Sequence, residues 1–186
     1  IEHLAMLRSL PNYMVFRPCD TRETAAGWYA ALTHTTTPTG LILSRQNMPA
    51  LEGTGKDALK GAYILRDCEA TPDVLLMASG SEVELIYKAY DELAAKGVKA
   101  RVISMPCWEL FTEQSDEYKE SVMPKAVRAR LAVEAAADFG WHKFVGLDGD
   151  VICMEGFGAS APAGTLFKDF GFTVEQVVER AMALVK

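Results

Sequence analysis

The chain has 186 residues, 49% of them hydrophobic and 24% charged, which is typical of a globular protein with one or two domains. The net charge of -6 argues against a nucleic-acid partner, because such a partner needs a basic face. No apolar run approaches the roughly 20 residues that span a bilayer, so no membrane partner is expected.

The residue types that bind metals do not gather in the sequence. Cys19, Cys68, Cys107 and Cys153 are widely spaced and contain no Cys-x-x-Cys pair. This spacing is typical of reduced thiols in a cytoplasmic protein. The three histidines do not cluster with the cysteines, so no zinc site is expected.

The first 56 residues predict a helix followed by one strand–helix–strand unit. Apolar spacing predicts a helix over 1–10, and the next apolar run predicts a strand over 13–16. Asp20, with Glu23 three residues later, is a predicted N-cap. The helix after it is expected to bury Ala25, Ala26, Trp28, Tyr29 and Leu32. Since the chain opens at Ile1 inside a helical pattern, we expect it to be a piece of a larger polypeptide.

Arg45 is the main candidate for a binding residue. The run Leu41–Leu43 predicts a buried parallel strand, which places Arg45 just past its carboxyl end. Open α/β sheets bind ligands at that edge, and a guanidinium is a planar fork of donors suited to phosphate. The alternative is a structural Arg that pairs with a nearby carboxylate.

A linker rich in Pro and Gly over 48–59 predicts a domain boundary near Lys56, giving domains 1–56 and 57–186. In the second domain we expect strands over 61–65, 74–78, 98–105, 131–135 and 151–154, with helices between them. Ser81 with Glu84, and Thr173 with Gln176, are predicted capping boxes. The pattern predicts a doubly wound, mostly parallel α/β sheet, preceded by a partial α/β (βαβ) domain.

Two glycine-containing turns invite a functional interpretation. The Ser79–Ser81 turn presents backbone N–H groups at a helix start, where a phosphate is able to bind, but it lacks the established phosphate-binding signatures. We therefore favour a tight turn there, and at 156–162 a helix start with Ser160 as N-cap. Glu134 and His142 have no predicted partner and are interpreted as ordinary polar residues.

The residues resemble one family along the whole chain. The helix at 1–8, Arg17-Pro18-Cys19-Asp20 and Leu43-Ser44-Arg45-Gln46-Asn47 resemble the later part of the transketolase pyrimidine-binding domain. Ala78-Ser79-Gly80-Ser81-Glu82-Val83, Ser104-Met105-Pro106, Val133-Glu134-Ala135 and the segment 157–163 resemble the C-terminal domain of the same family.

This resemblance implies a homodimeric parent that moves a two-carbon ketol unit between sugar phosphates, as in the pentose phosphate pathway or Calvin cycle. It implies thiamine diphosphate and Mg²⁺ (or Ca²⁺) in that parent, and a phosphate contact for Arg45. The residues that hold the cofactor and metal in the family precede the position of Ile1. We therefore expect no catalytic, cofactor or metal residue here and an inactive isolated fragment. The alternative is a stand-alone anion-binding or regulatory α/β module that uses the Ser79–Glu82 turn.

Overall fold

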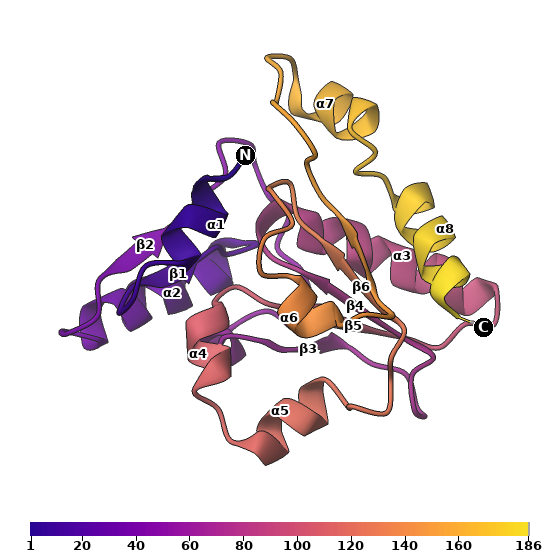
Figure 1. Cartoon of the computed structure of the whole chain (residues 1–186), viewed down its shortest axis with the longest axis horizontal. Helices are drawn as coiled ribbons and strands as arrows, with labels where there is room; N and C mark the ends of the chain where they lie inside the picture. Colours follow the sequence, from indigo (N-terminus) through magenta and orange to yellow (C-terminus); the bar gives the residue numbers. More distant parts are fainter. Residues whose placement is uncertain (186) are drawn as a thin grey trace.

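The computed structural model describes residues 1–185 (Figure 1). Its first part contains helix α1 (His3–Arg8), strand β1 (Met14–Phe16), helix α2 (Thr21–Thr33) and strand β2 (Thr39–Leu41). β1 and β2 pair in parallel, with Phe16 opposite Leu41, as the predicted strand–helix–strand unit requires. Lys186, the last residue of the predicted second domain, lies outside the described residues.

The second part is built on a sheet of five strands in the order β3-β5-β4-β6-β7. The strands are β3 (Tyr63–Arg66), β4 (Val74–Ala78), β5 (Ala100–Ser104), β6 (Arg130–Val133) and β7 (Asp150–Ile152). The helices are the 3-10 turns η1 (Lys56–Lys60) and η2 (Gly80–Glu82), and α3 (Val83–Ala95), α4 (Trp108–Thr112), α5 (Asp116–Val122), α6 (His142–Val145), α7 (Ala163–Asp169) and α8 (Val174–Leu184).

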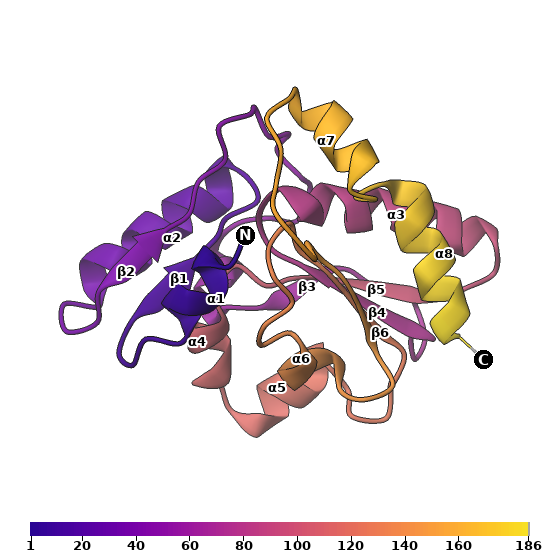
Figure 2. The same ribbon diagram turned by 45° about the horizontal axis from the view of Figure 1, so that its top comes forward.

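This sheet is mostly parallel and covered on both faces, which confirms the predicted doubly wound architecture. Only the edge strand β3 runs antiparallel to its neighbour. Successive residues of β4 point to opposite faces. Leu76 belongs to the core beneath α3 and α8, and Leu75 to the core beneath α4, α5 and α6. Figure 2 shows α3 and α8 above the strands and α5 and α6 below them.

The core beneath α3 and α8 continues into the first part of the chain. Phe16 of β1 and Ala30 of α2 are fully buried in the same cluster as Leu76. The two parts of the chain therefore pack through apolar side chains rather than through a solvated linker. Within residues 1–185, no helix is long and apolar enough to cross a membrane.

The predicted apolar face of α2 is wrong except at Ala26, which is buried, whereas Ala25 is exposed. Trp28, Tyr29 and Leu32 are 54%, 60% and 74% exposed. Apart from Glu23, the buried face is formed by the small residues Ala26, Gly27 and Ala30, because β1 and β2 approach the helix closely. A side-chain carbon at Gly27 would lie only 2.8 Å from both Phe16 and Leu41, so bulk is not tolerated on that side.

Other local predictions also need correction. β2 ends at Leu41 and is only half-buried, because it is the outer strand of a two-stranded sheet. α7 begins at Ala163 with Pro162, and not Ser160, at the N-cap. The strand predicted over 98–105 is shorter, Ala100–Ser104. By contrast, the Thr173 hydroxyl accepts from the Gln176 amide and caps α8 as predicted.

Candidate functional site

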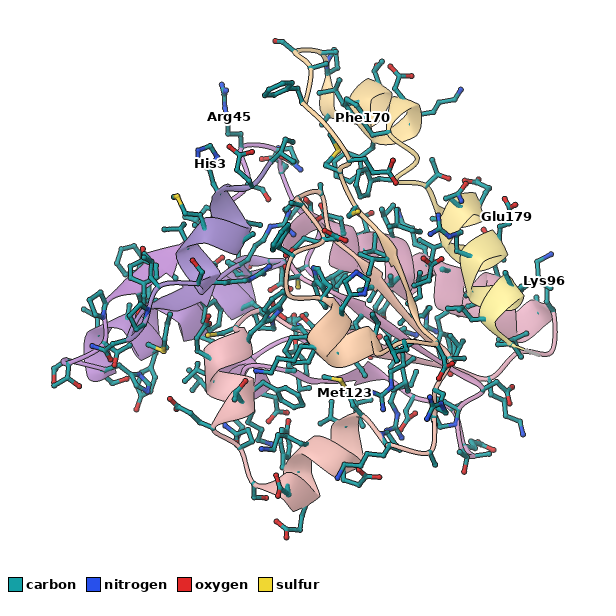
Figure 3. All side chains as sticks on the ribbon, viewed as in Figure 1. His3, Arg45, Lys96, Met123, Phe170 and Glu179 are labelled. Carbon is teal, nitrogen blue, oxygen red and sulfur yellow. The ribbon has the colours of Figure 1, made fainter. Side chains whose placement is uncertain are left out.

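Arg45 lies in a loop that begins where β2 ends. The strand stops at Leu41, so Ile42, Leu43 and Ser44 separate it from Arg45. The side chain is exposed, and in Figure 3 it extends outward from the upper edge of the molecule. No salt bridge within residues 1–185 involves the Arg45 guanidinium. The structure therefore gives no support to a structural Arg paired with a carboxylate.

An open pocket, lined by polar and apolar side chains, lies between the Arg45 loop and the turn that follows β1. It has a volume of about 400 Å³. One wall is formed by Cys19, Asp20 and Thr24, and the other by Ser44, Gln46 and Asn47. Residues on both sides of Arg45 in the sequence thus border the same open space.

Asp20 caps α2, as the sequence predicts, and also binds the residues that follow the Arg45 loop. Its Oδ1 accepts hydrogen bonds from the amides of Arg22 (3.0 Å) and Glu23 (2.9 Å). Its Oδ2 accepts from the Leu51 amide at 3.2 Å and from the Thr54 hydroxyl at 2.5 Å. The carboxylate is 4% exposed. One carboxylate oxygen of Asp20 therefore caps the helix, and the other binds the far end of the Arg45 loop.

The Ser79–Ser81 turn is closed and offers no space for an anion. The Gly80 amide donates to the Arg17 carbonyl, and a side-chain carbon on Gly80 would lie 2.6 Å from the Arg17 guanidinium carbon. The predicted Ser81–Glu84 capping box is wrong, because the 3-10 turn η2 delays α3 to Val83. The Ser81 hydroxyl bonds to the Glu82 carboxylate instead.

Glu134, interpreted from the sequence as an ordinary polar residue, is the centre of a buried ionic network. It directly follows β6 and is fully buried. Arg8 donates to both of its oxygens at 2.7 and 2.9 Å, and Trp141 Nε1 donates at 2.8 Å. Arg17 Nη1 lies 3.7 Å from Glu134 and 2.5 Å from Glu82.

Burial, the largest single influence, opposes ionisation of Glu134. The charge and hydrogen bonds of Arg8, the charge of Arg17 and the bond from Ser79 outweigh it, and they lower the pKa of Glu134 to about 2. The network joins residues of the first part of the chain, Arg8 and Arg17, to the second sheet.

Glu23 forms a second buried contact between the two parts. Its carboxylate accepts from the Cys19 amide at 2.8 Å, the Tyr63 hydroxyl at 2.7 Å and the Ser104 hydroxyl at 2.6 Å. Burial raises the pKa of Glu23, and these hydrogen bonds only partly offset that effect. The sequence gives a local indication for Glu23, because it stands three residues after a predicted cap. Nothing in the sequence indicates its distant partners Tyr63 and Ser104.

The remaining titratable candidates are isolated. His142 is exposed, and its Nε2 lies 3.2 Å from Asp138. The four cysteines are free thiols, and burial raises the pKa of Cys19 and of Cys107. Among residues 1–185, no three His, Cys, Asp or Glu side chains converge to hold a metal ion.

Two family models match the chain. Residues 61–173 match the transketolase-like C-terminal domain, and residues 1–50 match the transketolase pyrimidine binding domain.

Among curated relatives, chloroplastic transketolase of Solanum tuberosum is 50% identical over 184 residues, which is 97% of this chain and 25% of the relative. Probable transketolase of Streptococcus pneumoniae is 51% identical over 96% of this chain and 27% of the relative. The chain thus spans about a quarter of these relatives.

Solved transketolases have the same fold. The structure from Leishmania mexicana covers the whole chain with a TM-score of 0.94 at 43% identity, and the chain matches 27% of it. A transketolase of Pichia stipitis in complex with sedoheptulose-7-phosphate gives a TM-score of 0.93 at 43% identity over the whole chain and 27% of that protein.

Proposed function

This chain belongs to the transketolase family, and we propose that it forms the C-terminal part of an enzyme that transfers a two-carbon ketol unit between sugar phosphates. In this proposal Arg45 binds the substrate phosphate. The observation that carries it is an exposed guanidinium, without a salt bridge in residues 1–185, in a loop past the carboxyl end of a parallel strand.

The chemistry of Arg45 suits this role. A guanidinium stays charged at any working pH and donates two parallel hydrogen bonds to a phosphate. Transketolases of Pichia stipitis have been solved with sedoheptulose-7-phosphate, xylulose-5-phosphate and fructose-6-phosphate, so phosphorylated sugars are the ligands of a 43% identical relative.

Thiamine diphosphate enters the proposal only as the cofactor of the longer protein, together with Mg²⁺ or Ca²⁺. Residues 1–185 do not fit a metal-bound diphosphate. No three His, Cys, Asp or Glu side chains among them come together to hold a metal ion, and Arg17 closes the glycine turn after β4. We propose that the chain alone binds no cofactor and is inactive. We further propose a cytoplasmic homodimer and a domain boundary near Lys56.

The alternative function, a stand-alone anion-binding or regulatory module, has less support. It relies on the turn from Ser79 to Glu82, whose four residues are buried. The Gly80 amide is already bonded to the Arg17 carbonyl, so an anion would have to displace a packed segment of the first part.

Steady-state kinetics of the full-length protein that carries this chain test the Arg45 role. A charge-assisted contact contributes about 1.5–3 kcal/mol, so Arg45→Ala is expected to lower kcat/KM for phosphorylated acceptors by roughly one to two decades. The value for an unphosphorylated acceptor is expected to stay unchanged. Arg45→Lys is expected to recover only part of the loss, because a point charge lacks the planar fork.

Lys96→Ala is a matched control, since Lys96 is an exposed cation at the opposite end of the molecule (Figure 3). It is expected to change neither value. An equal loss on both kinds of acceptor with Arg45→Ala would show that Arg45 is structural and would overturn the phosphate role.

A further inference from the structure

Both ends of the Arg45 loop are attached to one short segment, which runs from the end of β1 to the start of α2. At the first end, the Ile42 amide donates to the Phe16 carbonyl at 2.9 Å and extends the β1–β2 pairing by one residue. At the second end, the Leu51 amide and the Thr54 hydroxyl donate to Asp20. Phe16 and Asp20 are both buried, so the segment is a rigid support.

Between these attachments no hydrogen bond holds the loop to the rest of residues 1–185. From Leu43 to Ala50, no backbone hydrogen bond to any residue in 1–185 is made, and the side chains are largely exposed. Such a loop has only its attached ends to limit where Arg45 is found. Loss of one attachment therefore enlarges the space that the guanidinium explores.

We propose that Asp20 is a positioning residue for the phosphate contact, acting through the Oδ2 attachment to Leu51 and Thr54. The proposal rests on the proposed function, because it assigns Asp20 a role through Arg45. A residue outside the loop thereby sets the fraction of molecules in which Arg45 is placed to receive a phosphate. Apparent affinity falls in proportion to that fraction.

Two substitutions separate this role from helix capping. Asp20→Asn keeps an oxygen for the Arg22 and Glu23 amides, and Asn caps helices about as well as Asp. Its amide nitrogen, however, replaces the oxygen that accepts from the Leu51 amide. Thr54→Val removes the other partner of Oδ2 without altering the cap, whereas Thr54→Ser retains the hydroxyl and is expected to behave as the unaltered protein.

The kinetic test uses the full-length protein with ribose-5-phosphate and an unphosphorylated acceptor. If release of the loop lowers the competent fraction to about one fifth, the KM for ribose-5-phosphate rises about fivefold in Asp20→Asn and Thr54→Val. The kcat, and both constants for the unphosphorylated acceptor, are expected to stay unchanged. Ser115→Ala, which removes the N-cap of α5, is the control for a loss of local stability far from the loop.

Limited trypsin digestion supplies a readout that does not depend on activity. Exposed, mobile loops are preferred sites of cleavage, so the rate of cleavage after Arg45 is expected to rise in Asp20→Asn and Thr54→Val but not in Ser115→Ala. Unchanged cleavage would show that Oδ2 does not hold the loop and would overturn the inference.

Faster cleavage with an unchanged KM would also overturn it, since the attachment would then be irrelevant to the phosphate. The Arg45→Ala variant, measured in parallel, distinguishes failure of the Asp20 proposal from failure of the proposed function. If Arg45→Ala discriminates between acceptors while Asp20→Asn does not, only the role of Asp20 fails. If Arg45→Ala does not discriminate, the proposed function fails, and the inference fails with it.

Discussion

Replacing Glu134 by Gln is expected to destabilise the chain strongly at neutral pH. The carboxylate is fully buried and binds Arg8 through two hydrogen bonds. Gln keeps the shape but not the charge, so Arg8 and Arg17 lose a shared counter-charge inside the protein. Removal of one partner from a buried ion pair typically costs about 3–5 kcal/mol. The free energy of unfolding is expected to fall by that amount.

The lowered pKa of Glu134 reflects the same contacts and gives a stabilisation of the same order. Lowering a carboxyl pKa from 4.5 to about 2 corresponds to roughly 3 kcal/mol of preference for the ionised form in the folded state. Because the folded-state pKa is the lower one, this stabilisation is complete above the unfolded-state pKa near 4.5. It is lost progressively as the pH falls toward 2.

Urea unfolding followed by far-UV circular dichroism at pH 7, 5, 4 and 3 measures both effects. Glu134→Gln is expected to be less stable at pH 7 and to lose less stability than the unaltered chain between pH 5 and 3. Glu113→Gln, at an exposed position on α4's C-cap, is the control and is expected to change the free energy of unfolding little. A Glu134→Gln variant within about 1 kcal/mol of the unaltered chain at pH 7 would refute the reasoning.

Four further outcomes are expected. Burial raises the pKa of Glu23, so the folded chain should lose stability as pH rises through that elevated pKa, and Glu23→Gln should remove this loss; pH-dependent urea unfolding checks this. Gly61→Ala should lower the free energy of unfolding by about 3 kcal/mol or more, because φ is +83° and the added carbon would lie 2.1 Å from the Phe111 amide nitrogen. Gly171→Ala, with φ of +80° but open space around it, should lower it by only about 1–2 kcal/mol in the same denaturation assay. Calorimetric titration of the chain with thiamine diphosphate and Mg²⁺ should show no binding, and micromolar affinity would contradict the proposal that the cofactor residues lie elsewhere. Hydrogen exchange should show residues 57–186 more protected than 1–56, and equal protection would argue against the boundary near Lys56.

The order and type of most elements followed from local patterns in the sequence. Short apolar runs bounded by turn residues identified the strands of the second sheet, and their alternation with helices predicted parallel pairing. Asp20 and Thr173 were recognised as caps, because a cap is a contact between residues only two or three positions apart. The motifs that resemble transketolase predicted the family that the comparisons show.

Local patterns were misleading where neighbouring elements set the outcome. The spacing of Trp28, Tyr29 and Leu32 is helical, but it does not reveal which face of α2 meets the sheet. The close approach of β1 and β2 selects the face with Gly27. The helix start after β4 was also misplaced, because Arg17 packs on Gly80 and the first turn there is 3-10.

The sequence by itself determined the α/β architecture, the family and the candidate Arg45, because these depend on periodicity, caps and continuous motifs. Only the tertiary structure decided that Glu134 is ionised in the core, since its partner Arg8 lies 126 positions away in the chain. The same holds for the second oxygen of Asp20, which reaches Leu51 and Thr54 across the Arg45 loop. The charge state and role of a buried polar group depend on the sum of desolvation and all nearby partners, and that sum exists only once distant segments have packed together.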